Sequence, residues 1–298
     1  MARHHRAEAA CDAQQRRRTL FDIDLRPPTQ SARRRPLAHR RAPTSGSGIN
    51  QAEYRRIGND STVRISPWRG DASTAQVVAV RCPAPDNATV LTLLELLGNR
   101  DVTTVLTAAL SPDDQHPFTA AGFTPLEHLT LMHRPLQPEE PTPPSRSPHR
   151  LSRIGRRRLS DTLAHRLSDT LAADTDAFSS FSPFWRFDSA AYAEACEATD
   201  LSRQRCVRID GRVVAYAITG RSSTSGFVQR LAVRPGHEGR GIGSVLLADA
   251  ISWLDRAGAR DVWVNTQPDN DRARLLYQRH GFAERAGGLV VLRHDTVR

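Results

Sequence analysis

A glycine-rich turn between a predicted strand and a predicted helix constrains the fold of this chain most. The turn reads Glu238-Gly-Arg-Gly-Ile-Gly-Ser244; it follows a strand predicted over residues 227–233 and leads into a helix predicted over residues 242–257. A helix N-terminus presents unpaired amide groups and the positive end of the helix dipole, and glycines allow a pyrophosphate to approach them closely. The backbone from Gly239 to Ser244 is therefore a candidate diphosphate-binding site.

Two common nucleotide-binding motifs do not fit this turn. A P-loop needs a Gly-Lys-Ser or Gly-Lys-Thr step, and the chain contains no Lys. A Rossmann fingerprint needs a third glycine at the position where Leu246 stands. The turn therefore indicates another diphosphate-containing ligand, or else a glycine turn that binds nothing.

Hydrophobic periodicity around the turn predicts a mixed α/β domain over residues 150–298. Within it, residues 158–164 are repeated as residues 166–172, and the repeat places leucines on one face of a helix. Asp210-Gly211 is a strong hairpin signal. Further helices are predicted over residues 189–198, 242–257 and 269–280, and strands over residues 205–209, 213–219, 227–233, 261–265 and 289–292.

The N-terminal half is predicted to hold a smaller folded unit. Residues 1–61 are rich in Arg and Pro and lack an apolar period, so we expect a disordered tail. Residues 62–136 are expected to form a small α/β unit, and a Pro-rich linker follows over residues 137–149. The elements expected in this unit are strands over residues 63–65 and 75–80 and a helix over residues 88–97.

Charge, cysteine content and hydropathy narrow the function classes. All 42 basic residues are Arg and the formal net charge is +10. An excess of Arg alone is typical of a GC-rich genome, so we expect no nucleic-acid partner. No stretch approaches the ~18 apolar residues of a membrane span, and the four cysteines lack metal-ligand spacing. We therefore expect a cytoplasmic protein without a metal ion or membrane contact.

Two motifs resemble those of one enzyme family. The coenzyme A loop of the GNAT superfamily of N-acetyltransferases reads Gln/Arg-x-x-Gly-x-Gly/Ala, and the stretch from Glu238 to Gly243 matches it except at Glu238. A second GNAT signature, Asn-x-x-Ala-x-x-Leu-Tyr-x-x-x-Gly-Phe, is complete from Asn270 to Phe282. The resemblance begins at about Leu151 and implies the GNAT fold, in which helices flank a mixed, mostly antiparallel sheet.

The resemblance also implies a reaction, the transfer of an acetyl group from acetyl-CoA as co-substrate to a primary amine by direct attack. Tyr277 is then the acid that protonates the departing thiolate, and a strand amide near Leu231 polarises the thioester carbonyl. The residues that the resemblance assigns to acetyl-CoA binding are Leu231, Ala232, Val233, Glu238, Gly239, Arg240, Gly241, Ile242, Gly243, Ser244 and Asn270.

The base that deprotonates the amine stays open at this point. Many relatives carry a carboxylate on one of two strands where this chain has Gln229 and Asn265. Ordered water, His237, Glu238 and His280 are the alternatives. The missing carboxylates also favour a second hypothesis, a non-catalytic acyl-CoA sensor.

The acceptor amine belongs either to a small molecule or to a protein N-terminus. Around both motifs the chain resembles the ribosomal-protein type of N-terminal acetyltransferase, which favours a protein α-amine. The oligomeric state is not predicted.

The two halves of the chain share a pattern. Residues 100–123 and residues 260–282 both begin with Arg-Asp-Val, contain a Pro-Asp turn and end with Gly-Phe. This register places Phe118, which has no hydroxyl, at the position of Tyr277, and nothing before Phe118 resembles the glycine-rich turn. Residues 62–136 are therefore expected to be a degenerate GNAT-like copy without a cofactor site, similar to the N-terminal part of two-part GNAT proteins of actinobacteria.

Overall fold

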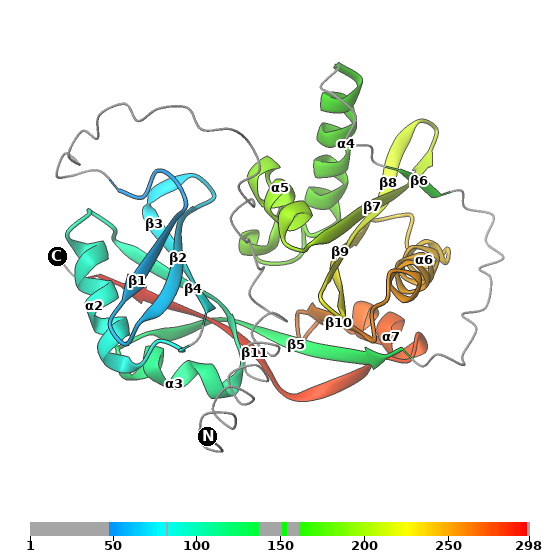
Figure 1. Ribbon diagram of the computed structural model, residues 1–298. Helices are drawn as coiled ribbons and strands as arrows, with labels where there is room; N and C mark the ends of the chain where they lie inside the picture. The colour runs from blue at the N-terminus through cyan, green and yellow to red at the C-terminus, as the bar shows by residue number, and fades with distance from the viewer. Residues whose placement is uncertain (1–47, 82, 137–150, 154–160, 297–298) are drawn as a thin grey trace, which may run out of the picture. The chain divides into compact units, whose positions relative to one another are not determined.

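The computed structural model describes residues 48–81, 83–136, 151–153 and 161–296 (Figure 1). Contacts divide the chain into two compact units. One runs up to His128 and includes the segment from Leu289 onward, and the other is Leu129–Gly288. The predicted tail up to residue 47, the predicted linker and the start of the direct repeat lie outside the described residues.

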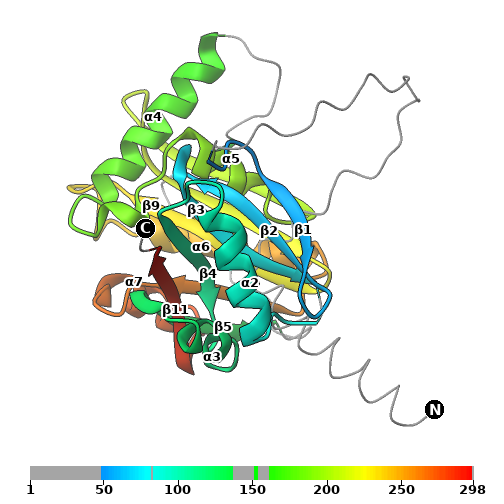
Figure 2. The same ribbon diagram turned by 90° about the vertical axis from the view of Figure 1, so that its left-hand side faces the viewer.

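The first unit is a sheet with two helices, which lie toward the viewer in Figure 2. Its elements in chain order are β1 (Glu53–Ile57), β2 (Ser61–Trp68), β3 (Asp71–Arg81), α2 (Asn87–Gly98), β4 (Thr104–Leu110) and α3 (Pro112–Ala120), followed by the start of β5 (Thr124–Pro135). β1, β2 and β3 form antiparallel pairs, and β3 pairs with β4 in parallel. Its core packs Val90, Leu93 and Leu97 of α2 against the sheet.

The prediction of a disordered tail was wrong for its last residues. Ile49 is fully buried in the core of the first unit, and β1 pairs with β2 along its whole length. Of the β1 side chains only Ile57 is buried. A strand with one buried residue has no apolar period of its own, and it is held by hydrogen bonds to its neighbour, which local sequence does not reveal.

The second unit is a larger sheet with helices on both faces. Its elements are the end of β5, β6 (Leu151–Arg153), α4 (Asp161–Ala177), the short 3-10 helix η1 (Pro183–Trp185), α5 (Ser189–Glu197), β7 (Leu201–Ile209), β8 (Arg212–Ser222), β9 (Ser225–Val233), α6 (Ile242–Arg256), β10 (Asp261–Thr266), α7 (Asp271–Arg279) and the start of β11 (Ala283–Asp295). The strand order is β5-β10-β9-β8-β7-β6. Of the five strand pairs in this order, four are antiparallel and the pair of β9 with β10 is parallel, so the predicted mixed, mostly antiparallel sheet is confirmed.

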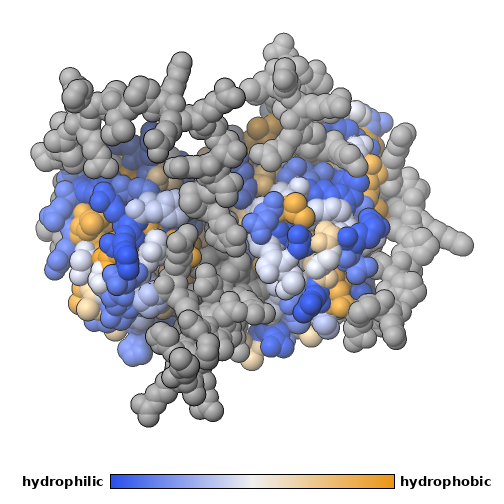
Figure 3. Space-filling model, viewed as in Figure 1, coloured by the Kyte–Doolittle hydropathy of each residue, from blue (hydrophilic) through white to orange (hydrophobic). Residues whose placement is uncertain are grey.

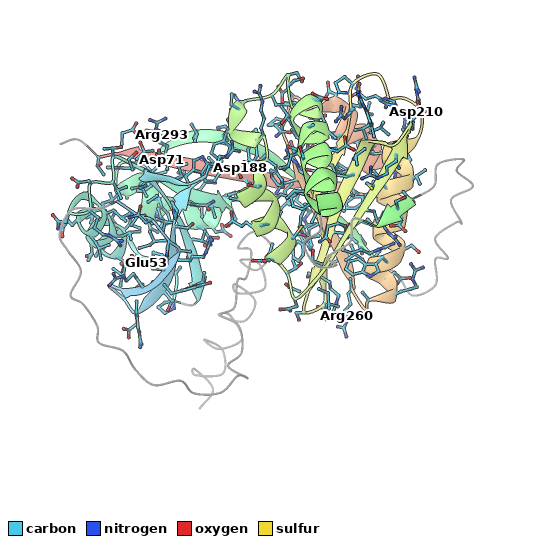
Figure 4. The ribbon with its side chains drawn as sticks, turned by 90° about the horizontal axis from the view of Figure 1, so that it is seen from above. Glu53, Asp71, Asp188, Asp210, Arg260 and Arg293 are labelled. Carbon is cyan, nitrogen blue, oxygen red and sulfur yellow. The ribbon has the colours of Figure 1, made fainter. Side chains whose placement is uncertain are left out.

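The helices of the second unit cover opposite faces of the sheet (Figure 1). α4 and α5 pack on one face through a cluster that includes Tyr192 and Tyr216, and α6 packs on the other through Leu246 and Leu247. α5 is capped by Asp188, whose carboxylate accepts a hydrogen bond from the amide of Ala191 at 2.7 Å. Figure 4 labels Asp188 at the start of α5 and Asp210 at the turn between β7 and β8.

The last strand of each half joins the unit formed mainly by the other half. The end of β5 pairs antiparallel with β10, so that His133 lies opposite Trp263 and Leu131 lies opposite Asn265. The end of β11 pairs antiparallel with β4. The predicted boundaries at residues 136 and 150 were therefore wrong for these two strands. Apolar patterning predicts a strand and its buried face, but it does not specify which sheet the strand joins.

The two Gly-Phe turns are built alike. The amide of Phe123 donates to the carbonyl of Phe118 at 3.1 Å, and the amide of Phe282 donates to the carbonyl of Tyr277 at 3.1 Å. The corresponding ring centroids are 5.3 Å and 5.7 Å apart. Both turns pass through a glycine with positive φ, at 91° for Gly122 and 79° in the second turn. The repeated sequence pattern thus corresponds to a repeated local structure.

Candidate active site

The glycine-rich turn leaves the start of α6 open. Gly236, Gly239 and Gly241 have φ values of 81°, 72° and 76°, and a Cβ atom added to any of them would meet no other atom within 4 Å. Gly241 is the N-cap of α6, and no side chain caps the helix there. Because amides at a helix N-terminus bind anions when no side chain covers them, the turn has the form that a diphosphate requires.

Gly243 is needed for a different reason. A Cβ atom at this position would lie 3.3 Å from the nearest side-chain carbon of Leu276 and 3.8 Å from those of Leu231 and Val233. The missing side chain therefore allows α6 to pack closely against α7 and β9. In this motif Gly239 and Gly241 allow a backbone with positive φ, whereas Gly243 allows close packing of the helix.

Glu238, the one departure from the coenzyme A loop pattern, forms an ion pair with Arg272 in the first turn of α7. Its side chain is 35% exposed. The arginine offsets the negative charge beside the turn, so an acidic residue at this position is compatible with an anionic ligand on the backbone amides.

Strands β9 and β10 stop pairing partway along their length. Parallel pairing ends at Phe227 opposite Trp263, although β9 continues to Val233 and β10 to Thr266. At the same level the register between β8 and β9 shifts by one residue, and Gln229 is the bulged residue that has no partner on β8. We call the region beyond Phe227 and Trp263 the split. The split includes Leu231, Ala232 and Val233 on β9. These residues pair with β8 and lie beyond the last residue of β9 that pairs with β10.

The second signature places Asn270 and Tyr277 on α7. The Asn270 side chain accepts a hydrogen bond from the amide of Ala273 at 3.1 Å and so caps the helix, which is a structural role in its own right. Tyr277 is 4% exposed, and burial raises the pKa of its hydroxyl above the usual value near 10, an effect that the charge of Arg230 partly offsets. The phenol is therefore protonated at neutral pH, as a proton donor must be.

Arg230 on β9 forms a buried ion pair that the sequence analysis did not identify. Its guanidinium donates two hydrogen bonds of 2.7 Å to the carboxylate of Asp174 on α4, and a third of 2.6 Å to the carbonyl of Trp185. It lies between the rings of Phe178 and Phe187, at 3.5 Å and 4.0 Å from their centroids. These hydrogen bonds connect β9 to α4 and to the segment between α4 and α5. The available signal was an arginine within a predicted strand of mostly apolar residues.

The residues considered as the base are not brought together. The Oε1 atom of Gln229 is buried without a hydrogen-bond partner in the described structure, and Asn265 is exposed. The Nδ1 atom of His280 lies 2.8 Å from the carbonyl of Leu276, at the C-terminus of α7. His237 follows the end of β9 in the glycine-rich turn. The sequence analysis did not consider His133, because residue 133 was assigned to the other half; in the structure it lies on β5 opposite Trp263.

The described residues contain neither a cluster of metal-ligating side chains nor a membrane-spanning helix. Among those residues no three His, Cys, Asp or Glu side chains cluster in a way that could hold a metal ion. None of the described helices is both long enough and apolar enough to cross a membrane. On the face seen in Figure 3 the described surface is mostly hydrophilic, with apolar side chains in small separate groups.

Comparison with known proteins supports the resemblance for the second unit. Residues 167–282 match the family described as "Acetyltransferase (GNAT) family". The stretch includes the glycine-rich turn and both motif residues of α7. The fold is the GNAT fold, as the strand order and the solved structures with similar folds agree.

Two groups of relatives are informative. The ribosomal protein bS18-alanine N-acetyltransferases of Escherichia coli and Salmonella typhimurium are 31% and 33% identical over 75 residues, or 25% of this chain, and the chain spans about half of their length (51%). A tandem GNAT protein from the clavulanic acid biosynthesis pathway has a TM-score of 0.58 at 16% identity, covering 81% of both chains. A GCN5-related N-acetyltransferase from Kribbella flavida has a TM-score of 0.50 at 16% identity, covering 83% of this chain and 91% of that one.

Proposed function

We propose that this chain transfers an acetyl group from acetyl-CoA to a primary amine by direct attack. The observation that carries the proposal is the open N-terminus of α6, where Gly241 leaves the first helical amides without a side-chain cap. The split between β9 and β10 begins on the strand that leads into this turn, and Tyr277 is on the next helix of the same unit. An anion site, an interrupted strand pair and a buried acid are together what an acyl-CoA enzyme needs.

The backbone groups would bind the co-substrate. We assign the diphosphate of acetyl-CoA to the amides between Gly239 and Ser244, because they lie at the positive end of the α6 dipole. The pantetheine arm would lie along Leu231, Ala232 and Val233, whose backbone groups on the β10 side are outside the described ladder. Asn270 would contact the arm from the start of α7.

The chemical step needs a polarised carbonyl and a proton for the leaving group. A strand amide near Leu231 would stabilise the oxyanion that forms when the amine nitrogen attacks the thioester carbon. As the tetrahedral intermediate collapses, the carbon–sulfur bond breaks and Tyr277 would protonate the thiolate. The acetylated nitrogen loses a proton to solvent, and the tyrosine recovers its proton from solvent.

A protein α-amine is the acceptor that we favour. The curated relatives that match 75 residues of the chain are named as alanine acetyltransferases of a ribosomal protein. For the first unit we propose a degenerate GNAT-like copy without a cofactor site. The repeated Gly-Phe turn and the likeness to a tandem GNAT protein support this proposal.

A second candidate function is a non-catalytic acyl-CoA sensor. It is favoured by Gln229 and Asn265, which stand where many relatives carry a carboxylate. Both functions require acetyl-CoA binding, and only the first requires an acid at Tyr277.

Tyr277→Phe distinguishes the two functions in the full-length protein. We expect acetyl-CoA-dependent release of coenzyme A, with a peptide that has a free N-terminal alanine, to fall about 10²- to 10⁴-fold. The acetyl-CoA dissociation constant should stay within about threefold, since the hydroxyl acts on the leaving group. Phe118→Tyr, the reverse exchange at the matching position of the first unit, is the control and should leave the rate unchanged. Turnover that survives Tyr277→Phe would remove the tyrosine from the reaction, and acetyl-CoA binding without any turnover would favour the sensor.

A further inference from the structure

One face of the sheet carries a row of side chains at the level where the split begins. The strand registers place Gly220 opposite Phe227, Phe227 beside Trp263, and Trp263 opposite His133. Directly paired residues project from the same face of a sheet. The bulged Gln229 lies on this face as well, because a Cβ atom on Gly220 would come within 2.8 Å of its Oε1 atom.

Buried polar atoms without partners gather in this row. Gln229 Oε1, Trp263 Nε1 and Asp261 Oδ1 are buried and have no hydrogen-bond partner in the described structure. More than nine in ten buried polar groups in proteins are hydrogen-bonded, so unpaired ones call for an explanation. An acceptor on Gln229 and a donor on Trp263, on either side of the split, are suited to a polar group that enters from outside the protein.

His133 stands next to these atoms on β5. Its ring lies 4.1 Å from the ring of Trp263, and its Nε2 atom lies 3.6 Å from a carboxylate oxygen of Asp261. The side chain is 21% exposed. The 3.6 Å separation is longer than a hydrogen bond, so Asp261 acts on the ring through its charge. A proton on Nε2 facing this carboxylate leaves Nδ1 as the nitrogen that can accept another.

We propose that His133 is the general base of the acetyl transfer and that Asp261 is a positioning residue that orients its ring. The proposal rests on the proposed function. His133 takes one proton from the acceptor ammonium, directly or through one water, and the nitrogen lone pair then forms the new bond to the thioester carbon. The carbon–sulfur bond breaks, the thiolate takes its proton from Tyr277, and the second amine proton leaves to solvent, which also reprotonates the tyrosine.

The position of His133 suits this role. Neighbouring strands are about 4.8 Å apart, so β5 brings the histidine to within one strand of the edge of β10 at which the split opens. Asn265, where many relatives carry the base, is two residues further along β10 on the same face. His133 on β5 thus supplies a basic group near the split, where the side chains of Gln229 and Asn265 cannot take a proton.

The pKa of His133 narrows the class of acceptor. Burial lowers this pKa below its usual value near 6.5, an effect that Arg285 on β11 adds to and Asp261 on β10 opposes. A base with such a pKa takes a proton from an α-amine, with a pKa near 7.7–8.0, at a disadvantage of at least roughly tenfold to thirtyfold. For a lysine amine near 10.4 the disadvantage is at least roughly 10⁴-fold. A base with a lowered pKa is therefore better matched to the α-amine proposed above as acceptor than to a lysine side chain.

The test compares His133→Gln with His128→Gln, the same exchange at an exposed position of the same strand. Full-length protein is assayed with a lysine-free peptide carrying a free N-terminal alanine, and with an N-terminally blocked peptide carrying one lysine. We expect His133→Gln to lower kcat with the first peptide by about 10²- to 10⁴-fold while the acetyl-CoA dissociation constant stays unchanged. His128→Gln should match the parent protein, and the lysine peptide should be the poorer substrate.

A pH profile and chemical rescue separate proton transfer from a packing role. Because the base must be neutral, kcat/KM of the parent protein should rise with pH through a pKa below 6.5, and His133→Gln should lose this acidic limb. Added imidazole should restore part of the activity of His133→Ala, and it should not restore Tyr277→Phe. A merely structural histidine would give neither result.

Three outcomes would overturn the assignment. The first is a His133→Gln variant that keeps the rate and the pH profile of the parent protein while Tyr277→Phe is inactive. This result would support the proposed acetyl transfer but would exclude His133 as its general base. The second is a preference for the lysine peptide, or turnover of neither peptide by a parent protein that binds acetyl-CoA. The third is an absence of acetyl-CoA binding by the parent protein, which would overturn the proposed function as well.

Discussion

Helices α2 and α6 hold matching places in the two units, but their N-termini differ. Each helix follows a strand that pairs antiparallel on one side and in parallel with the strand after the helix. α2 begins at Asp86, whose carboxylate accepts a hydrogen bond from the amide of Thr89 at 2.8 Å. α6 begins at Gly241 with no side-chain cap. A carboxylate at a helix start satisfies the amides and repels phosphate, so the same scaffold has either a stable helix end or an anion site.

The matching positions on α3 and α7 also differ, but here the side-chain cap is on the helix of the second unit. Ser111 precedes Phe118 by seven residues, as Asn270 precedes Tyr277. Asn270 caps its helix through a side-chain hydrogen bond, and Ser111 does not. The first unit therefore retains the Gly-Phe turn geometry of the second, but α2 is capped where α6 is not, and Phe118 stands where the second unit has the phenol of Tyr277. Because of these differences, we expect the second unit to bind acetyl-CoA and the first unit not to bind it.

Transplanting the cap should give the largest effect. Gly241→Asp places at α6 the carboxylate that α2 carries, and we expect acetyl-CoA affinity to fall at least about 100-fold, since both the amide site and its charge are lost. Gly241→Asn is the control for charge, because Asn also tolerates a positive φ and can cap the amides but adds no charge. Affinity measured by calorimetry should fall less with Asn, and equal losses would indicate that the added charge contributes nothing.

The buried ion pair should make the second unit sensitive to a single charge. Asp174→Asn leaves Arg230 buried without its counter-ion, and we expect the free energy of unfolding to fall by about 3–5 kcal/mol. The control is Asp295→Asn in the exposed pair with Arg293, which is labelled in Figure 4, and it should change stability by about 1 kcal/mol or less. Denaturant unfolding measures both, and equal effects would contradict a structural role for the buried pair.

The reverse exchanges in the first unit should not create a second site. We expect Asp86→Gly, alone or with Phe118→Tyr, to leave acetyl-CoA stoichiometry unchanged, because the segment between β3 and α2 lacks the glycines of the other turn. Calorimetry checks this expectation. Binding of a second acetyl-CoA to either variant would mean that the Asp86 cap alone prevents the first unit from binding acetyl-CoA.

Removing the Asp86 cap should have the smallest effect. Hydrogen bonds from Thr89 hold the pKa of Asp86 below its usual value, so its stabilising contribution is present above the unfolded pKa near 3.8 and is lost as pH falls through the folded value. Asp86→Ala should lower the thermal midpoint by a few degrees at pH 7, without affecting activity. The difference from the parent protein should shrink toward pH 3, and a constant difference would argue against the charged cap.

Local patterns predicted the second unit well. Glycines in a turn, an Asn before a helix and Asp-Gly between alternating strands each act through nearby backbone, so they can be read from a short window. α5 and α6 begin at the first residues of the helices predicted over residues 189–198 and 242–257. The β7–β8 hairpin turns at the predicted Asp210-Gly211. The roles of Tyr277 and of the acetyl-CoA residues stay predictions.

Features that depend on distant parts of the chain were missed. β1 has one buried side chain and is held by its partner strand. The exchange of β5 and β11 between units leaves no periodic signal, since a strand has the same alternation in either sheet. His133 was missed for this reason, because only the pairing of β5 with β10 brings it opposite Trp263.

The most direct test of the central claim is calorimetric titration of acetyl-CoA into the full-length protein, with Gly241→Asp and Asp86→Ala as paired variants. We predict micromolar binding of one acetyl-CoA per chain, lost in Gly241→Asp and retained in Asp86→Ala. Two sites per chain, binding that survives Gly241→Asp, or no binding at all would contradict the account.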